Sequence, residues 1–437
     1  MSDVKTPSGA AHGASPRGFY GWWIAATAFV TFGLSVGIPY YNLPFFYDYF
    51  QKAFHWDLES ITLGFPLAAL LTIWVGPLLI PKLSPKKLIV VGTGFTAVAL
   101  FGFSRMGGSL PVYFFFYFMY TVGYIFSGPI PHQILVSYWF QKKRGTAMGF
   151  VYVGVGLFGG LGGFLVKPLS ENYGFRTALA ALAGIMFVTW PLAIFLLKDK
   201  PSEIGQFPDG EAMPPPDAKL APRSYGYLGR SGSFWLLLIG SFCSIGAIGS
   251  INVHMKLVFR DAGFSPQSVL NSTWLTASYL ILWSSIIGRV SIGYFADKFS
   301  KKLVMTATYF LVAGTIPLLL AVKPPDQPHV FGLVFGLAMG ADYMLIPLMA
   351  AEQFGVNTLG RAMAIILPVN TIGQTWCPFL VSRLREHYGS YTVPMGVVFG
   401  IAMVGALAIA VLPHRNAGEE AQDAPMAAPT ALNEPGT

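Results

Sequence analysis

The sequence predicts an all-α membrane protein with twelve transmembrane helices in two pseudo-repeated six-helix bundles. Three observations predict this fold class: the composition, the number of long apolar segments, and motifs that recur half a chain apart. Of the 437 residues, 54% are hydrophobic and only 11% are charged, whereas soluble domains carry about 25% charged residues. This composition indicates that most of the chain lies in a lipid bilayer.

Twelve apolar segments are long enough to cross roughly 30 Å of hydrocarbon at about 1.5 Å of helix rise per residue. They lie near residues 19–43, 59–80, 88–104, 109–135, 145–166, 175–197, 233–258, 267–295, 302–322, 329–353, 361–383 and 392–413. We expect an N-terminal cytoplasmic tail (1–18), a first bundle (19–197), a Pro-rich cytoplasmic linker (198–232), a second bundle (233–413) and a disordered cytoplasmic tail (414–437).

Short motifs recur in register between the two halves. LSPKKLIV at 83–90 matches FSKKLVM at 299–305, KRGTAMG at 143–149 matches LGRAMA at 359–364, and NYGFRT at 172–177 matches HYGSYT at 387–392. Three matches at a nearly constant offset predict a duplication, with the binding site between the halves near the bilayer midplane. That architecture is typical of a carrier.

The charges predict the topology. If the N-terminus lies in the cytoplasm, most Lys and Arg residues fall on the cytoplasmic segments. We therefore expect a protein of the inner membrane with both termini in the cytoplasm. The net charge of +8 follows from this bias, and we do not expect a nucleic-acid partner. Two isolated cysteines, Cys243 and Cys377, imply no disulfide framework, and no cleavable signal peptide is evident.

Arg289 is the leading functional candidate because it lies inside the eighth apolar segment. A charged side chain in a spanning helix is expensive and therefore faces a cavity or a partner. Its planar fork of donors suits a carboxylate. The alternative is a structural pair with Asp342. Ser285 shares the helical face of Arg289 and is a weaker candidate.

Three further ionisable residues each leave two roles open. Asp342 is the only carboxylate well inside an apolar segment, where it can carry a proton or serve as a partner of Arg289. His254, in the outer third of the seventh segment, can titrate near neutral pH or form an interhelical hydrogen bond. Glu352, near the cytoplasmic end of the tenth segment, is expected to act in gating or to pair with a basic residue.

Several polar side chains are expected to form the walls of the substrate path. Polar groups at this depth must face protein or water, because lipid leaves them unpaired. The candidates for cavity walls and hydrogen bonds are Tyr40, Tyr120, Tyr124, Tyr343, Asn370 and Gln374. The glycines of GVGLFGGLGG at 154–163 indicate close helix packing rather than a phosphate loop.

Four motifs resemble those of known families. Gly293, Asp297, Lys298, Lys301 and Lys302 have the spacing of the loop signature of the major facilitator superfamily. YWFQKKRGTAMG at 138–149 resembles the fifth-helix motif of the monocarboxylate transporters. GFYGWW at 18–23 resembles the beginning of the first helix in the same family. VHMKLVFRDAGFS at 253–265 resembles the seventh helix of bacterial members and of the related oxalate–formate antiporters.

The resemblance implies a proton-linked symporter of a small organic anion such as lactate or pyruvate, with the proton as co-substrate and no other cofactor or metal. It places Arg289 on the arginine that pairs with the substrate carboxylate, and Asp297, Lys298 and Arg144 in gating roles. Animal members carry a Lys where this chain has Tyr40 and an Asp where it has Ser285. The resemblance therefore does not carry the family's proton-coupling residues onto this chain. We expect the monomer to be functional.

Two rival functions stay open. The first is an organic-anion antiporter or sugar-acid carrier on the same scaffold, which exchanges anions without net proton flow. The second is a membrane receptor that does not transport, which the polar residues at mid-membrane depth argue against. An enzyme is not expected, because the sequence contains no evident nucleophile–base pair, metal-ligand spacing or nucleotide loop.

Overall fold

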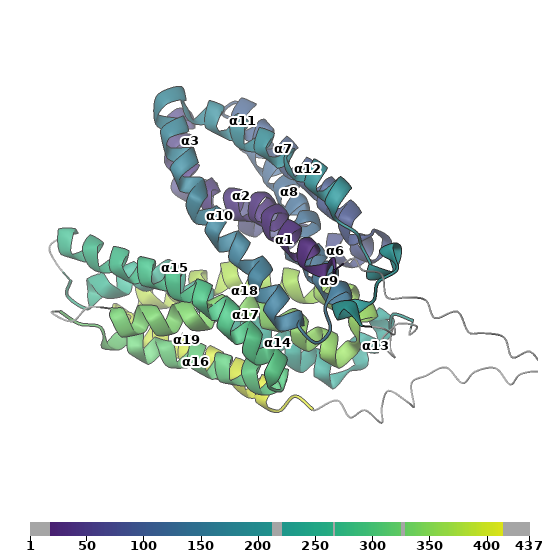
Figure 1. Ribbon diagram of the computed structural model, residues 1–437. Coiled ribbons are helices and arrows are strands. Elements are labelled where there is room, and N and C mark those ends of the chain that lie inside the picture. Colours follow the sequence, from purple (N-terminus) through teal and green to yellow (C-terminus); the bar gives the residue numbers. More distant parts are fainter. Residues whose placement is uncertain (1–17, 212–220, 265–266, 325–327, 414–437) are drawn as a thin grey trace, which may run out of the picture.

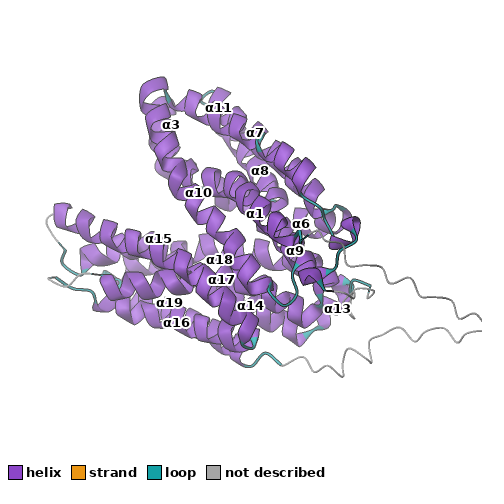
Figure 2. Cartoon of the chain, in the orientation of Figure 1, coloured by secondary structure: helices purple, strands orange, loops and turns teal. Residues whose placement is uncertain are grey.

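The structure, a computed structural model, describes residues 18–211, 221–264, 267–324 and 328–413. Figure 2 shows that this part of the chain consists of helices joined by short loops, with no strand. Helices suit the apolar composition, because a bilayer offers backbone N–H and C=O groups no partner and a helix pairs them internally. The expected disordered tail at 414–437, nearly all of the N-terminal tail and the three prolines at 214–216 lie outside the described residues.

The first six spans are often interrupted. Pro39, Pro44 and the Gly128–Pro129 pair coincide with breaks, because proline removes a backbone donor and clashes with the preceding turn. The elements are α1 (Gly21–Phe32), the π-helix η1 (Gly33–Gly37), α2 (Ile38–Asn42), η2 (Leu43–Phe46), α3 (Tyr47–Phe54), α4 (Leu58–Thr62), α5 (Gly64–Leu71), α6 (Val75–Leu79), η3 (Ile80–Lys82), α7 (Pro85–Arg105), α8 (Leu110–Ser127), α9 (Pro129–Trp139), α10 (Arg144–Tyr173), α11 (Phe175–Met186), α12 (Thr189–Pro191) and η4 (Leu192–Leu196).

The last six spans are single helices. Short helices η5 (Pro201–Ile204), η6 (Pro208–Gly210) and α13 (Tyr225–Arg230) precede them. The spans are α14 (Gly232–Asp261), α15 (Gln267–Lys298), α16 (Lys301–Ala321), α17 (His329–Phe354), α18 (Val356–Tyr388) and α19 (Thr392–Ala410).

The predicted number of spans is confirmed. Within the described residues eleven helices are long and apolar enough to cross a membrane, and the second span makes twelve when its two pieces, bent by 43°, are counted together. Several helices extend beyond the predicted apolar segments: the first span continues through α3 to Phe54, and α10 continues to Tyr173. Hydropathy marks only the lipid-facing part of a helix, whereas its backbone ladder continues into the polar interface.

The spans form two bundles that meet at one end. Figure 1 shows the first bundle, in purple to teal, and the second, in green to yellow; they converge near α9 and α13 and diverge toward α3 and the beginning of α15. Across the convergence α10 packs against α15, and α18 packs against α5 and α9. Gly145 lies against the backbone of Gly293, where any added side chain would clash. Small residues permit this close helix contact.

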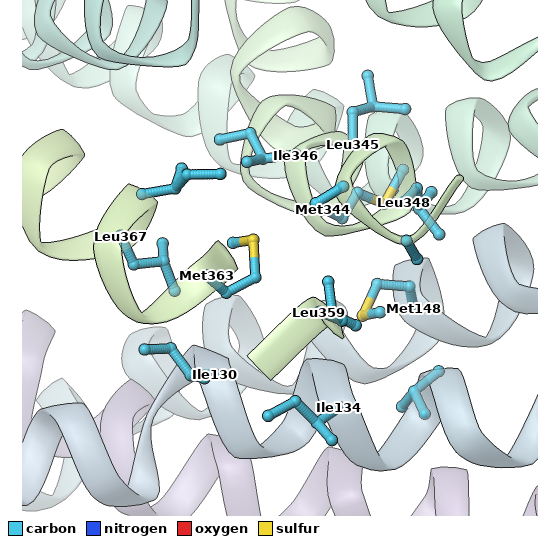
Figure 3. Close-up of a cluster of buried hydrophobic side chains, with 14 of the residues drawn as sticks. Ile130, Ile134, Met148, Met344, Leu345, Ile346, Leu348, Leu359, Met363 and Leu367 are labelled. Carbon is cyan, nitrogen blue, oxygen red and sulfur yellow. The ribbon is translucent and has the colours of Figure 1, made fainter. Parts of the chain in front are cut away.

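An apolar seal closes the end where the bundles converge. Figure 3 shows Ile130 and Ile134 of α9 and Met148 of α10 gathered with side chains of α17 and α18. These residues belong to one buried cluster that joins the two bundles. From the second bundle the seal includes Met344, Leu345, Ile346, Leu348, Leu359, Met363 and Leu367. The seal separates the polar residues near mid-span from the linker side.

Candidate functional site

Arg289 lies at the interface between the two bundles. Its backbone carbonyl faces Gly149, whereas its guanidinium faces Gly156, seven residues further along α10. Seven residues of α-helix span about 10 Å. The side chain therefore runs along the interface, away from the seal and toward the end where the bundles diverge. Gly156 leaves room for it: a Cβ there would be 3.1 Å from Nη1.

The guanidinium is buried but not neutralised by an acid. Arg289 is 8% exposed, and Nη1 donates to the Ser285 hydroxyl at 3.0 Å. Nε has no hydrogen-bond partner among the described residues. No carboxylate in the described chain forms an ion pair with it, and the ionisable groups that interact with it electrostatically are Tyr41 and Tyr152 of the first bundle. A buried, unpaired cation with a free donor is suited to bind an anion.

Aromatic rings of the first bundle form one wall near this interface. Tyr40 stacks on Tyr124 with 5.7 Å between centroids, and Phe65 meets both rings edge-on. Phe65 and Tyr124 also line a cavity between the bundles, which Leu367 and Thr371 of α18 close from the other side. Tyr120 is buried near Phe65 and does not line this cavity. The wall offers apolar ring faces more than charge.

Asp342 lies inside the second bundle rather than beside Arg289. The carboxyl is fully buried and accepts a hydrogen bond from the Ser244 hydroxyl of α14 at 2.8 Å. The Tyr309 side chain of α16 is its other polar neighbour. The alternative of an Arg289–Asp342 pair is therefore wrong within this structure. A carboxyl placed among three helices of one bundle links any change of its protonation to the packing of that bundle.

Three other predicted site residues form bonds within the second bundle. Tyr343 donates to the Gln374 side chain at 2.7 Å, which joins α17 to α18. Asn370 accepts from the Ser241 hydroxyl at 3.1 Å, and its amide nitrogen has no partner among the described residues. These bonds satisfy polar groups that lipid would leave unpaired.

His254 joins three parts of the second bundle. Nδ1 lies 3.0 Å from the Tyr391 hydroxyl, and Nε2 lies 2.9 Å from the Pro378 carbonyl oxygen. The carbonyl oxygen can only accept, so Nε2 carries the proton, and Nδ1 accepts from the phenol. Because both nitrogens are engaged in the neutral ring, the geometry favours an interhelical link between the two roles left open for His254.

The predicted gating residues lie at the closed end. The Asp297 carboxylate accepts from the backbone N–H groups of Gly145 and Thr146, at 2.6 and 2.7 Å, and from the Thr146 hydroxyl at 2.6 Å. These groups begin α10, so the acid of one bundle caps a helix of the other at its positive end. Arg144 instead bonds the Phe140 carbonyl of its own bundle.

Two further predicted residues of this end, Lys298 and Glu352, contact residues of their own bundle. Lys298 lies over the Tyr294 ring at 4.6 Å. Glu352 pairs with Lys301 at 2.8 Å, which fits the expected pairing with a basic residue. The linker contacts the first bundle: the Tyr225 hydroxyl donates to the Pro77 carbonyl at 2.6 Å, and burial raises the pKa of that phenol.

Sequence reasoning missed a buried polar cluster in the first bundle. It consists of Thr31, His132, Gln133 and Tyr152, each less than 10% exposed. His132 and Gln133 are adjacent polar residues inside an apolar segment, PIPHQILVSYW, and that position was the available signal. Within the described chain no group of three metal-ligating side chains is close enough to hold an ion.

A family comparison identifies the scaffold. The model of the Major Facilitator Superfamily matches residues 129–331 and 268–434, which together cover more than half of the chain. The chain belongs to the Major Facilitator Superfamily. The fold supports this assignment: E. coli fucose:proton symporter FucP superposes with a TM-score of 0.66 at 12% identity, over 91% of this chain and all of that one. The human organic anion transporter MFSD10 gives the same score at 11% identity, over 89% and 99%.

Curated relatives within the superfamily include monocarboxylate transporters. Monocarboxylate transporter 13 of Bos taurus is 23% identical over 408 residues, which cover 91% of each chain. Monocarboxylate transporter 10 of Danio rerio is 23% identical over 346 residues, which cover 77% of this chain. The match spans 65% of that protein, slightly less than two thirds of its length. The MFS transporter asaE of Aspergillus flavus is 25% identical over 91% of this chain and 88% of its own length. This major facilitator protein is thus a multi-pass transporter with monocarboxylate transporters among its relatives.

Proposed function

We propose that this protein moves a small monocarboxylate, such as lactate or pyruvate, together with a proton by alternating access. The observation that carries the proposal is Arg289: a buried guanidinium without an acidic partner, whose Nε is free, at the interface between the two bundles. A carboxylate supplies the missing charge and acceptor. One such cation favours a single carboxylate, because a dicarboxylate requires a second.

Asp342 is the proposed proton carrier. It is fully buried, and the donor nearest to it is a neutral serine hydroxyl. A carboxyl in such a site can exist charged or neutral at modest cost, which coupling to a proton requires. Because Asp342 and Arg289 make no contact, the coupling acts through the packing of the second bundle rather than through a shared hydrogen bond.

The closed end is proposed to be the cytoplasmic one. Lys86, Lys142, Lys298 and Lys301 lie near it, and basic residues favour the inner side of a membrane. With this orientation in an inner membrane, both termini are cytoplasmic and the two bundles diverge on the outer side. Rocking the bundles about Arg289 exposes the site to the other side. The linker contact between Tyr225 and Pro77 breaks during that movement.

Exchange of two organic anions is the second candidate function. The observation that favours it is the bonding of His254. Both nitrogens of its neutral ring already have hydrogen-bond partners, which removes one of the two residues predicted to couple transport to protons. An antiporter needs only Arg289 and no proton carrier. Its uptake responds to internal anion and not to an uncoupler.

Uptake of labelled L-lactate into proteoliposomes tests the proposal. We expect an inward proton gradient to drive uptake, and unlabelled pyruvate to compete better than oxalate. Rapid exchange with internal lactate and no effect of the gradient would replace symport by antiport. If L-lactate is neither accumulated nor exchanged, the monocarboxylate proposal is wrong.

A further inference from the structure

The buried pair formed by Gln133 of α9 and Tyr152 of α10 has no role in the site as described so far. The Gln133 amide nitrogen donates to the Tyr152 hydroxyl oxygen. Gln133 is fully buried and Tyr152 is 6% exposed. The Gln133 carbonyl oxygen has no hydrogen-bond partner among the described residues. Polar side chains buried this deeply in a membrane span are costly and often mark a functional site.

Tyr152 is on the face of α10 that contacts Arg289. Gly149, three residues earlier, faces the Arg289 carbonyl, and Gly156, four residues later, faces its guanidinium. Residues separated by three and four positions share one face of a helix. The Arg289 guanidinium and the Tyr152 hydroxyl also interact electrostatically. Tyr152 and Arg289 therefore border the same space from opposite bundles.

Other side chains of the first bundle hold the Tyr152 ring in place. Phe32 of α1 meets it edge-on at 5.2 Å and stacks on His132 at 4.6 Å. His132 is bonded in turn to the Thr31 hydroxyl at 3.0 Å and to the Gly128 carbonyl at 2.8 Å. The phenol is thus oriented before any ligand arrives. Because Gln133 donates to the phenol oxygen, the proton of Tyr152 remains available to donate.

We propose that Tyr152 is the second anchor of the carboxylate, with Gln133 as its positioning residue. One carboxylate oxygen accepts from Arg289 and the other accepts from the Tyr152 hydroxyl, so the bound anion joins the two bundles. This inference rests on the proposed function and deepens it. A neutral second donor adds affinity without a second charge, so the site is matched to a monovalent anion.

Tyr41 is the less suitable donor at this interface. It is the other ionisable neighbour of Arg289 in the first bundle, but 52% of its surface is exposed. A half-exposed ring is held less firmly than a buried one, so its hydroxyl is less well positioned to meet a substrate oxygen. Tyr152 is buried, so its donor gains most from a substrate oxygen.

Initial rates of labelled L-lactate uptake into proteoliposomes test the assignment. Tyr152→Phe removes one oxygen. We expect KM to rise about tenfold, because one hydrogen bond to a charged group is lost. Vmax is expected to stay within about twofold of the wild-type value. Gln133→Leu is expected to raise KM less. If Gln133 acts through the Tyr152 hydroxyl, Gln133→Leu adds nothing in the Tyr152→Phe background.

Tyr117→Phe is the matched control. Tyr117 is also a buried tyrosine of the first bundle, but its hydroxyl pairs with Tyr47 at 3.0 Å, away from Arg289. Its KM is expected to equal that of the wild type. A wild-type KM in Tyr152→Phe, or a lower Vmax with unchanged KM, overturns the inference. If Tyr152→Phe does not reconstitute, a wild-type KM in Gln133→Leu overturns it.

The same experiment separates this inference from the function on which it rests. Wild-type uptake of L-lactate that is insensitive to Tyr152→Phe removes the second anchor and leaves the monocarboxylate transporter intact. Absence of L-lactate uptake by the wild type overturns the proposed function, and the second anchor with it.

Discussion

The guanidinium of Arg289 lies against Gly156 of the opposite bundle, with Nη1 only 3.1 Å from the point where a Cβ of residue 156 would stand. The carbonyl of the same arginine lies against Gly149. Arg289 is therefore both a packing element of the α10–α15 interface and the charged group at its open end. A carboxylate bound there contacts the surface along which the bundles must move.

The glycine at 156 provides the first prediction. Gly156→Ala places a methyl group 3.1 Å from Nη1 and 3.7 Å from Cζ, so the guanidinium must move by a few tenths of an ångström. We expect KM for labelled L-lactate to rise severalfold, because carboxylate binding by a planar fork depends on its geometry. Initial uptake rates in proteoliposomes measure this.

Gly160→Ala is the control for that variant. Gly160 lies one turn further along α10 and has open space where its Cβ would stand. Both substitutions favour the helix to the same extent, up to about 1 kcal/mol. Equal KM values for the two variants would show that Gly156 does not set the position of the guanidinium.

The Asp297 cap provides a prediction about the closed end. Asp297→Asn removes the charge that binds the first N–H groups of α10 from the other bundle. Such an interaction is worth about 1–2 kcal/mol, so the open population of this end is expected to rise about tenfold. The readout is faster labelling of a cysteine introduced by Ile134→Cys, within the apolar seal, in a background without Cys243 and Cys377.

Asp261→Asn is the matched control for the cap. Asp261 pairs with Arg385 at 2.8 Å, and both residues belong to the second bundle. Loss of that pair does not alter the contact between the bundles, so the labelling rate is expected to stay at the wild-type value. A labelling rate in Asp297→Asn equal to this control would refute the role of the cap.

Asp342→Asn tests the proton carrier. Asparagine keeps the size of the side chain and an acceptor for Ser244, but it cannot exchange a proton. We expect exchange of L-lactate across the membrane to persist, whereas accumulation driven by a proton gradient is lost. Comparison of counterflow with gradient-driven uptake distinguishes the two activities.

His254→Gln accompanies that test. Loss of the bonds to Tyr391 and Pro378 is expected to lower Tm by a few degrees, an effect of about 1 kcal/mol, and to leave the response to the gradient unchanged. If Asp342→Asn still accumulates L-lactate in response to the gradient, the proton pathway does not include Asp342. If only His254→Gln loses that response, the histidine is the proton group.

The sequence predicts the spans and the depth of each residue better than it predicts contacts. Arg289 could be identified because a charge inside an apolar segment has few explanations. Its neighbour could not, since helical periodicity shows which residues share a face but not which helix that face meets. The sequence alone therefore allows Asp342 as a partner of Arg289, although the Asp342 carboxyl accepts a hydrogen bond from Ser244 of its own bundle.

Tyr152 shows a second limit of the sequence. It lies just before a run of glycines that predicts packing, and the glycines do pack: Gly154 against α1, and Gly149 and Gly156 against Arg289. The packing signal conceals a buried polar side chain on the same face. Gln133 was detectable as a polar residue in an apolar segment, but its partner lies 19 residues away on the next helix.

Uptake by Arg289 variants tests the central claim most directly. Arg289→Lys keeps the charge but not the fork, and Arg289→Ala removes both. We predict that each variant purifies as a monodisperse protein with a Tm close to that of the wild type, and that counterflow of labelled L-lactate falls about a hundredfold, the effect of losing a buried charged contact. Wild-type counterflow in either folded variant would contradict the claim that Arg289 binds the carboxylate.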